Sequence, residues 1–156
     1  MEKTASRGLD VQSGKPPPSR VLVVDDEALL RWSVAETLGD QGWQVTEAAD
    51  AESAMVAFPG IAAASGLVFL DLRLPDSDDL HVLAAMRRLS PHTPVILMTA
   101  HGTPDLAEAA RALGAFAVID KPFDMAELGP LAEQASGHPR ARLTSRKPVD
   151  TTRRTS

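Results

Sequence analysis

Four apolar runs of this chain each lead to residues that could take part in chemistry. They are Asp25, Asp26 and Glu27 after residues 21–24, Asp71 after 67–70, Thr99 after 95–98, and Lys121 shortly after 115–119. Two unit charges about 4 Å apart interact by about 4 kcal/mol at an effective dielectric of about 20, so clustered carboxylates need a cation or a proton. An all-oxygen cluster suits a hard ion that keeps several waters, and Mg²⁺ fits best.

A hydroxyl and a lysine beside such an ion are the groups that phosphoryl transfer requires. Thr99 and Lys121 would disperse the charge on the equatorial oxygens of a transferring phosphoryl group. Asp71 would then be the nucleophile and would form an acyl phosphate. Each of these residues alone has an ordinary structural explanation, such as a solvated turn or a sheet threonine. Their joint occurrence at successive strand ends favours the chemical interpretation.

The elements that must position these residues alternate along the chain. Apolar runs predict strands at 21–24, 43–48, 67–71, 95–99 and 115–119, and helical patterns lie at about 27–39, 51–58, 80–89, 104–113 and 125–135. Such alternation implies parallel strands joined by right-handed crossovers and covered on both faces. We therefore expect an α/β fold with a doubly wound five-stranded parallel sheet and five helices. The carboxyl ends of its strands, where ligands bind in such sheets, would bring the chemical residues together.

Capping residues support two of the helix starts. Residues 103–105, Thr-Pro-Asp, combine an N-cap, a proline at the first helical position and an acid that complements the helix dipole. Asp124 and Glu127 have the spacing of a capping box. Pro130 falls in the second turn of the last expected helix, where proline tends to kink or break a helix.

Length and composition predict one domain with two tails. The chain has 156 residues, of which 44% are hydrophobic, enough for one core of ordinary size. We expect a disordered leader at 1–19, the folded domain at 20–136 and a basic flexible tail at 137–156. The tail carries a net charge of +5 against −10 for everything before it. The acidic body argues against nucleic acid as the main ligand of the domain, because neutralising phosphates requires clustered Lys and Arg.

Absent features exclude several classes of protein. The chain has no cysteine, which excludes a disulfide framework and a thiolate metal site and suits a reducing cytosol. No apolar run approaches the roughly 20 residues that cross a membrane, and the N-terminus lacks the apolar region of a signal peptide. We therefore expect a cytoplasmic protein without a membrane partner. The four histidines show no ligand spacing, and we expect Trp32 and Trp43 to be packing residues.

Four motifs resemble the receiver domain of bacterial two-component response regulators, over residues 20 to about 136. They are VLVVDDE (21–27), LDLRLPDSDDL (70–80), VILMTA (95–100) and IDKPFD (119–124). The stretches LLRWSVAETL and GAFAVIDKPFD look most like receivers of enhancer-binding transcription activators of the nitrogen-regulation type. The resemblance implies the flavodoxin-like strand order 2-1-3-4-5.

The resemblance also implies a role for each site residue. Asp71 would accept a phosphoryl group from a sensor histidine kinase or a histidine phosphotransfer protein. Asp26, Asp71 and the backbone carbonyl of Arg73 would hold Mg²⁺, with Asp25 reaching it through water. Thr99 and Lys121 would bind phosphoryl oxygens, and the Lys121–Pro122 bond would be cis.

The function implied is that of a switch, which catalyses only its own phosphorylation and slow dephosphorylation. Its conformational change would control a downstream protein or a homodimer through the fourth helix, fifth strand and fifth helix. Transcription regulation is one such output. The natural chain would be either a single-domain receiver or a longer protein.

Three residues depart from the family pattern. Asp79 stands where a glycine is usual, Val118 stands where an aromatic switch residue is common, and Pro130 could distort the last helix. We expect phosphorylation to survive these changes. The output at Val118 is expected to be muted or differently shaped, because valine offers less rotamer contrast than tyrosine.

Residues of the same motifs bear on three other functions. A haloacid-dehalogenase-like phosphohydrolase needs an aspartate two residues after its nucleophile, where this chain has Arg73. A flavodoxin-type mononucleotide module should present amides and hydroxyls in its first loop, where this chain has Asp25 and Asp26. A receiver-like interaction domain that signals without phosphate stays open.

Overall fold

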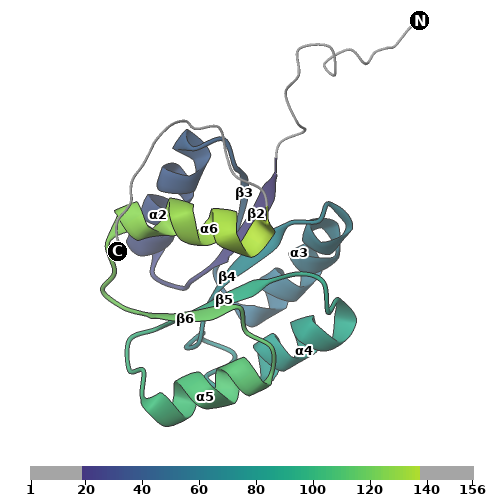
Figure 1. Cartoon of the computed structure of the whole chain (residues 1–156), viewed down its shortest axis with the longest axis vertical. Helices are drawn as coiled ribbons and strands as arrows, with labels where there is room; N and C mark the ends of the chain where they lie inside the picture. The colour runs from purple at the N-terminus through teal and green to yellow at the C-terminus, as the bar shows by residue number, and fades with distance from the viewer. Residues whose placement is uncertain (1–18, 138–156) are drawn as a thin grey trace, which may run out of the picture.

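The computed structural model describes residues 19–137 as a five-stranded parallel sheet flanked by helices (Figure 1). The strands are β2 (Arg20–Val24), β3 (Gln44–Ala48), β4 (Leu67–Asp71), β5 (Val95–Thr99) and β6 (Ala117–Asp120). The helices are α2 (Ala28–Asp40), α3 (Ala51–Ala63), α4 (His81–Leu89), α5 (Pro104–Ala112) and α6 (Leu128–Ser136), with a 3₁₀ turn η1 (Met125–Glu127) before α6.

The strand order is β3-β2-β4-β5-β6, which is 2-1-3-4-5 when the strands are counted along the chain. This confirms the predicted fold class and its order. The expected leader and tail lie outside the described residues apart from Ser19 and Gly137. No helix within the described part of the chain is long and apolar enough to cross a membrane.

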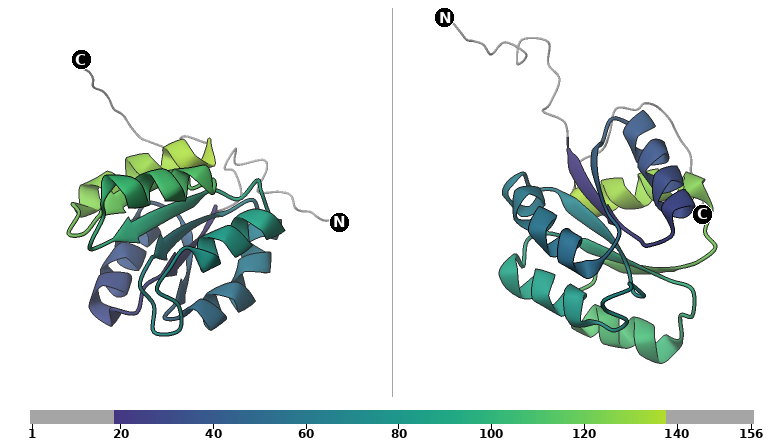
Figure 2. Two further views of the ribbon diagram at one scale, coloured as in Figure 1. Left: turned by 90° about the horizontal axis from the view of Figure 1, so that it is seen from below. Right: turned by 180° about the vertical axis from the view of Figure 1, so that it is seen from behind.

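Helices cover both faces of the sheet (Figure 2), and the core lies in two layers, one on each face. Successive residues of β2 alternate between the layers, as the pleat of a strand requires. Val21 and Val23 pack in the layer under α2 and α6. Leu22 and Val24 pack in the layer under α3, α4 and α5. Residues 21–24, 67–70 and 95–98 of β2, β4 and β5 are therefore buried on both faces, which explains why these runs are apolar throughout.

Helix α3 is longer than the sequence predicted. The helix was expected over residues 51–58, but α3 continues through Pro59 to Ala63. Phe58 and Ile61 are each only 2% exposed. Burying both side chains on one face favours continuation of the helix, although proline at this position removes one backbone donor.

The last helical segment also differs from the expectation. It is divided into η1 and α6, and Pro130 is the third residue of α6. The amides of a first helical turn have no acceptor within the helix, so proline costs little there. Asp124 accepts a hydrogen bond from the amide of Ala126 at 3.0 Å, so it caps η1 and does not form the expected capping box with Glu127. The predicted N-cap at Thr103 is confirmed, with the amide of Leu106 donating to its hydroxyl at 3.1 Å.

The two tryptophans have different environments. Trp43 is 4% exposed and packs in the layer under α2 and α6, as expected. Trp32 is 55% exposed on α2, so its assignment as a packing residue was wrong. Apolar residues of α2 are not confined to one face, because Leu29 is also exposed while Val34 and Leu38 are buried. The segment's apolar residues therefore do not mark one buried face.

Candidate functional site

Two buried carboxylates lie at the carboxyl edge of the sheet, where the strand order reverses between β2 and β4. Asp25 follows β2 and is 1% exposed, and Asp71 ends β4 and is 4% exposed. Turn amides hold both side chains. The amide of Glu27 donates to Asp25 Oδ1 at 2.9 Å, and that of Arg73 donates to Asp71 Oδ1 at 3.2 Å.

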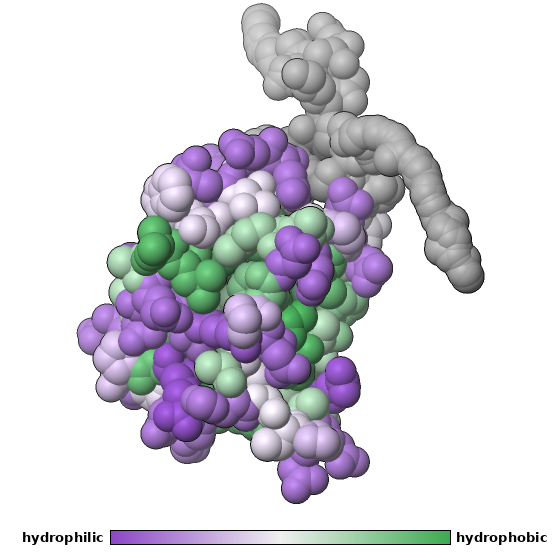
Figure 3. Space-filling model, turned by 90° about the vertical axis from the view of Figure 1, so that its left-hand side faces the viewer, coloured by the Kyte–Doolittle hydropathy of each residue, from purple (hydrophilic) through white to green (hydrophobic). Residues whose placement is uncertain are grey.

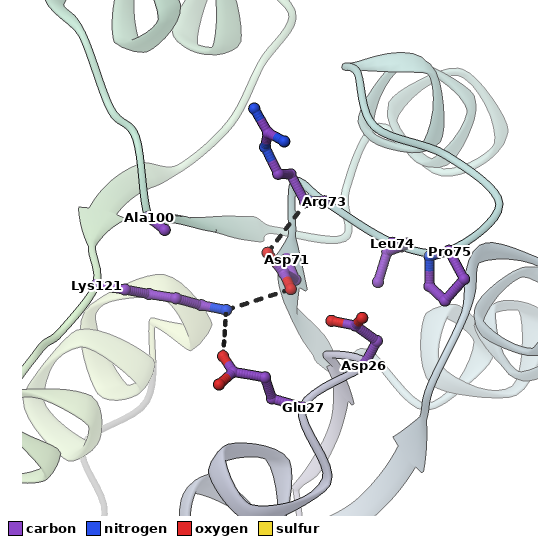
Figure 4. Close-up of a pocket in the computed structure, with 8 residues that line it drawn as sticks. All are labelled: Asp26, Glu27, Asp71, Arg73, Leu74, Pro75, Ala100 and Lys121. Carbon is purple, nitrogen blue, oxygen red and sulfur yellow. Dashed lines mark hydrogen bonds and ion pairs between the residues drawn. The ribbon is translucent and has the colours of Figure 1, made fainter.

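Lys121 places its ammonium between these carboxylates. Its Nζ lies 2.8 Å from Asp25 Oδ2 and 3.2 Å from Asp71 Oδ2, and 3.6 Å from Glu27 Oε1. Figure 4 shows the Lys121 side chain reaching across the pocket to Asp71 and Glu27. Its backbone amide donates to the Thr99 carbonyl at 2.8 Å, which extends the pairing of β5 with β6 to the site. The Lys121–Pro122 peptide bond is cis, as the resemblance implied.

The site has the ligands of a hard cation. Asp25, Asp26 and Asp71 each offer a carboxylate oxygen, and the three oxygens lie within 4.8 Å of one another. Asp26 is exposed at the opening of a pocket of about 270 Å³. The pocket is lined by Asp26, Glu27, Asp71, Arg73, Leu74, Pro75, Ala100 and Lys121. This oxygen set fits Mg²⁺ better than a softer metal.

Charge balance supports the same fit. Burial, together with the nearby charge of Asp25, raises the pKa of Asp71 to about 6, although the charge of Lys121 and the hydrogen bond from the Arg73 amide act to lower it. Burial acts to lower the pKa of Lys121, but its hydrogen bond to Asp25 and the charges of Asp25 and Asp71 outweigh this and raise it. Lys121 therefore stays protonated at neutral pH. Lys121 carries one positive charge among several carboxylates, so the net charge of the pocket stays negative and favours binding of a divalent cation.

The structure brings most of the expected site residues together. Asp25, Asp26, Asp71 and Lys121 meet directly. Thr99 lies at the same edge and is 2% exposed, and its hydroxyl accepts a hydrogen bond from the amide of His101 at 3.1 Å. Ala100, and not Thr99, lines the pocket. We therefore expect the Thr99 side chain to rotate, or its loop to shift, when the hydroxyl meets a ligand in the pocket.

Val118 lies beside a second hollow, of about 290 Å³. The hollow is lined by Gly102, Thr103, Pro104, Ala107, Arg111, Val118 and Asp120. It therefore lies between the loop after Thr99, the start of α5 and strand β6. A larger side chain at position 118 would border this hollow.

Arg31 is a site residue that the sequence interpretation missed. Its Nη1 donates to the backbone carbonyl of Asp25 at 2.7 Å, and its Nε donates to Glu47 Oε1 at 3.0 Å. Arg31 thereby fixes the backbone that carries the acidic pair to α2 and β3. Its position four residues after Glu27, in the first turn of the expected helix, was a local signal that this side chain could reach the strand end.

The Arg31→Met variant is expected to lose about 1–2 kcal/mol of unfolding free energy. Its hydrogen bond to the Asp25 carbonyl is made by a charged donor, and such bonds contribute more than neutral ones. Glu47→Gln is the matched control, because it weakens only the partly exposed ion pair, which should cost less than about 1 kcal/mol. Urea unfolding of both variants measures the difference. Equal losses would show that the Asp25 contact contributes nothing of its own.

The fold and the pocket define a flavodoxin-like α/β domain with a lysine-bearing acidic site at the topological switch point. The sequence model of the response regulator receiver domain matches residues 21–132. The chain belongs to this family, and it is homologous to regulators of two-component systems.

Named relatives agree with the nitrogen-regulation character of the motifs. The chain is 35% identical over 117 residues to regulatory protein AtoC of Escherichia coli, covering 75% of this chain and 25% of AtoC. It is 34% identical over 118 residues to the transcriptional regulator NtrC of Salmonella typhimurium, covering 76% of this chain and 25% of NtrC. It thus spans about a quarter of the length of either relative.

Solved structures show the same fold. The receiver domain of NtrX from Brucella abortus is similar with a TM-score of 0.68 and 39% identity, covering 75% of this chain and 98% of that one. A CheY-like receiver protein from Methanospirillum hungatei has a TM-score of 0.71 at 23% identity, covering 78% of this chain and 95% of that one. This second likeness concerns the fold alone.

Proposed function

We propose that this receiver accepts a phosphoryl group on Asp71 from a phosphorylated histidine of a partner protein. A carboxylate oxygen of Asp71 attacks phosphorus, the new O–P bond forms as the P–N bond breaks, and the histidine nitrogen keeps the electron pair of that bond. With a pKa of about 6, Asp71 is mostly the required carboxylate at neutral pH. The product is an acyl phosphate, and its formation and slow hydrolysis are the only reactions catalysed.

One observation carries this proposal, namely the placement of Asp71 relative to its neighbours. Asp71 lines the pocket and lies 3.2 Å from Lys121 Nζ. Asp25 does not line the pocket, and its two oxygens are engaged by the Glu27 amide and Lys121. Asp26 lines it but is exposed, so its orientation is less constrained. Asp71 is therefore the carboxylate best placed to attack a phosphorus atom that enters the pocket.

The other residues bind and orient the phosphoryl group. Lys121 would contact one phosphoryl oxygen, and Thr99 would contact another once its hydroxyl turns into the pocket. Asp26, Asp71 and the Arg73 carbonyl would hold Mg²⁺, with Asp25 reaching it through water. When bound, Mg²⁺ supplies positive charge that offsets the carboxylates and the developing charge on phosphorus.

The partners fall into two groups. A sensor histidine kinase or histidine phosphotransfer protein must reach the pocket, and α2 beside it presents Leu29 and Trp32, 76% and 55% exposed. Figure 3 shows green apolar patches among polar residues on the side of the molecule that lies at the left of Figure 1. The output would use α5, β6 and α6, toward a downstream protein or a second copy. From the family and the sequence we also infer a cytoplasmic location, a leader at 1–19 and a tail at 137–156.

Acetyl phosphate, a small phosphoryl donor, tests the proposed reaction. Incubation with Mg²⁺ should add the mass of one phosphoryl group to the intact protein, and chelation of the metal should prevent this. Asp71→Asn should abolish the addition, whereas Asp79→Asn, in an exposed position of the same loop, should leave it unchanged. Uptake that persists in Asp71→Asn would contradict the assignment. A chain that takes up no phosphoryl group would instead be a receiver-like domain that signals without phosphate.

The response at Val118 gives a further expectation. Closing of Thr99 on a phosphoryl oxygen should move the loop at 100–103, whereas Val118 has little side-chain freedom to respond. Beryllofluoride, a phosphoryl mimic, should therefore shift the amide NMR signals of this loop more than those of residues 117–119. Filling the adjacent hollow in Val118→Phe should enlarge the shifts at 117–119. Large shifts there in the unaltered protein would contradict a muted output.

A further inference from the structure

The loop between Asp71 and α4 includes a tight turn beside the pocket. The amide of Leu74 donates to the Ser77 carbonyl at 2.7 Å, and that of Ser77 donates to the Leu74 carbonyl at 3.2 Å. The Leu74 side chain is 6% exposed and belongs to the core layer below. Asp76 lies within this turn at an exposed position. The Leu74 side chain thus packs the loop against the core, whereas Asp76 stays outside the core.

Asp76 caps a helix that lies much earlier in the chain. Its Oδ1 accepts a hydrogen bond from the amide of Ala51 at 2.7 Å, and its Oδ2 accepts one from Glu52 at 3.0 Å, across 25 and 24 residues. These are the first two amides of α3, which have no acceptor within the helix. A carboxylate that accepts two such bonds also interacts favourably with the helix dipole. The side chain of the conventional N-cap residue, Asp50, accepts hydrogen bonds from the amide of Ser53, at 2.7 Å, and from the Ser53 hydroxyl.

The cap therefore joins two parts of the functional site. Helix α3 packs against β2 and β3, and β2 leads directly to Asp25 and Asp26. The loop that carries Asp76 also carries Arg73, whose amide bonds Asp71. Figure 4 shows Leu74 and Pro75 on the wall across the pocket from Lys121. Asp76 thus fixes the position of that wall relative to the strand that brings in the other carboxylates.

We propose that Asp76 is a positioning residue for the metal and phosphoryl site. This role rests on the proposed function, in which the Arg73 carbonyl is a metal ligand. Asp76 holds that carbonyl at the distance from Asp26 that one ion requires. Partners that orient metal ligands typically change metal affinity by about 10- to 100-fold when removed. The coupling must be reciprocal, so metal binding must also strengthen the bonds from α3 to Asp76.

Two simpler roles would give different results. Asp76 could be a helix cap that adds only stability, or one more negative charge that attracts the cation. Asp50→Ala removes a cap from the same helix without touching the loop, so it controls for the first role. Asp78→Asn removes the same charge from an exposed position of the same loop, so it controls for the second.

Magnesium titration by calorimetry, with the whole chain and its variants, tests the proposal. Asp76→Ala should weaken Mg²⁺ binding about tenfold, and Asp76→Asn, which keeps one acceptor oxygen, should fall between it and the unaltered protein. Asp78→Asn should change the affinity by less than about threefold, because exposed charges are screened. Asp50→Ala should lower the urea midpoint and leave the Mg²⁺ affinity unchanged. If Asp76→Ala does not fold, Asp76→Asn carries the test.

Hydrogen exchange supplies a readout that a purely structural cap would not change. Saturating Mg²⁺ should slow exchange of the Ala51 and Glu52 amides more than that of Ser53, and the slowing should be smaller in Asp76→Asn and vanish in Asp76→Ala. Asp76 variants that bind Mg²⁺ as tightly as Asp78→Asn, or Ala51 and Glu52 amides that do not respond to Mg²⁺, overturn the positioning role. Unaltered protein that binds no Mg²⁺ overturns the proposed function itself, and this inference with it.

Discussion

Phosphorylation by acetyl phosphate is expected to slow by about 100- to 1000-fold in the Lys121→Met variant. Lys121 and Arg73 are the two cationic residues that line the pocket, and the Lys121 ammonium lies 3.2 Å from Asp71 Oδ2. A group so close to the attacking carboxylate can also contact a phosphoryl oxygen. Removing a preorganised donor of this kind typically costs about two to three orders of magnitude in rate. Stopped-flow or quenched kinetics followed by intact mass measures the change.

The same variant should be less stable, and the loss should grow with pH. Without Lys121, Asp25 and Asp71 face each other unpaired, and breaking a buried pair costs about 3–5 kcal/mol when the remaining charge cannot be neutralised. Asp71 can be neutralised by a proton. Lys121 lowers the pKa of Asp71, so its removal should raise that pKa above about 6. The destabilisation should therefore be small at pH 5 and large at pH 8.

Arg88→Met is the matched control for Lys121→Met. Arg88 is exposed on α4, so this variant makes the same change in net charge away from the site. It should phosphorylate at the normal rate, and its stability should change by less than about 0.5 kcal/mol at either pH. Similar losses in both variants would show that net charge, and not the position of Lys121, governs the effect.

The second large effect concerns the stability of the metal-free protein, which should fall as pH rises from about 4 to 7. The folded-state pKa of Asp71 is about 6, above the ordinary value of 3.8. Between these values the folded state binds the Asp71 proton more tightly than the unfolded state does. Stability is therefore lost through this window as pH rises, by about 2–3 kcal/mol once Asp71 is ionised.

Asp71→Asn isolates this contribution, because asparagine does not ionise. The variant should be more stable than the unaltered protein at pH 7 without divalent cations, and the difference should shrink toward pH 4. Added Mg²⁺ should stabilise the unaltered protein, by about 2.7 kcal/mol at a concentration 100 times its dissociation constant. It should stabilise Asp71→Asn much less. Urea unfolding at several pH values measures both effects, and equal stability of the two proteins at pH 7 would contradict the raised pKa.

The strand ends of the site could be predicted from the sequence, because their signal is local. Residues 67–70 and 95–98 are apolar, and each run is followed by one polar residue that ends the strand. This pattern predicted both strands with their observed bounds. Parallel strands share one carboxyl edge, so Asp71 and Thr99 had to lie on the same side of the sheet. The order of the motifs along the chain then identified the family that the sequence comparison shows.

Contacts between distant segments could not be predicted in the same way. Nothing in the local sequence around Asp76 shows that its carboxylate meets amides 24 and 25 residues earlier. Helix α3 passes through Pro59 because burial of Phe58 and Ile61 outweighs the lost backbone bond. Trp32 lies exposed on α2. This could not be predicted, because residue type alone does not say which helical face meets the core. Each of these features depends on tertiary packing.

Fluorine NMR of beryllofluoride tests the central chemistry most directly, namely that Asp71 coordinates a phosphoryl-like group only when a divalent cation balances the acidic pocket. New fluorine signals of the bound species should appear with the unaltered protein and Mg²⁺, and they should be absent without Mg²⁺ and in Asp71→Asn. Asp79→Asn should give the same signals as the unaltered protein. Signals that persist without Mg²⁺ or without the Asp71 carboxylate, or that never appear in the unaltered protein, would contradict this chemistry.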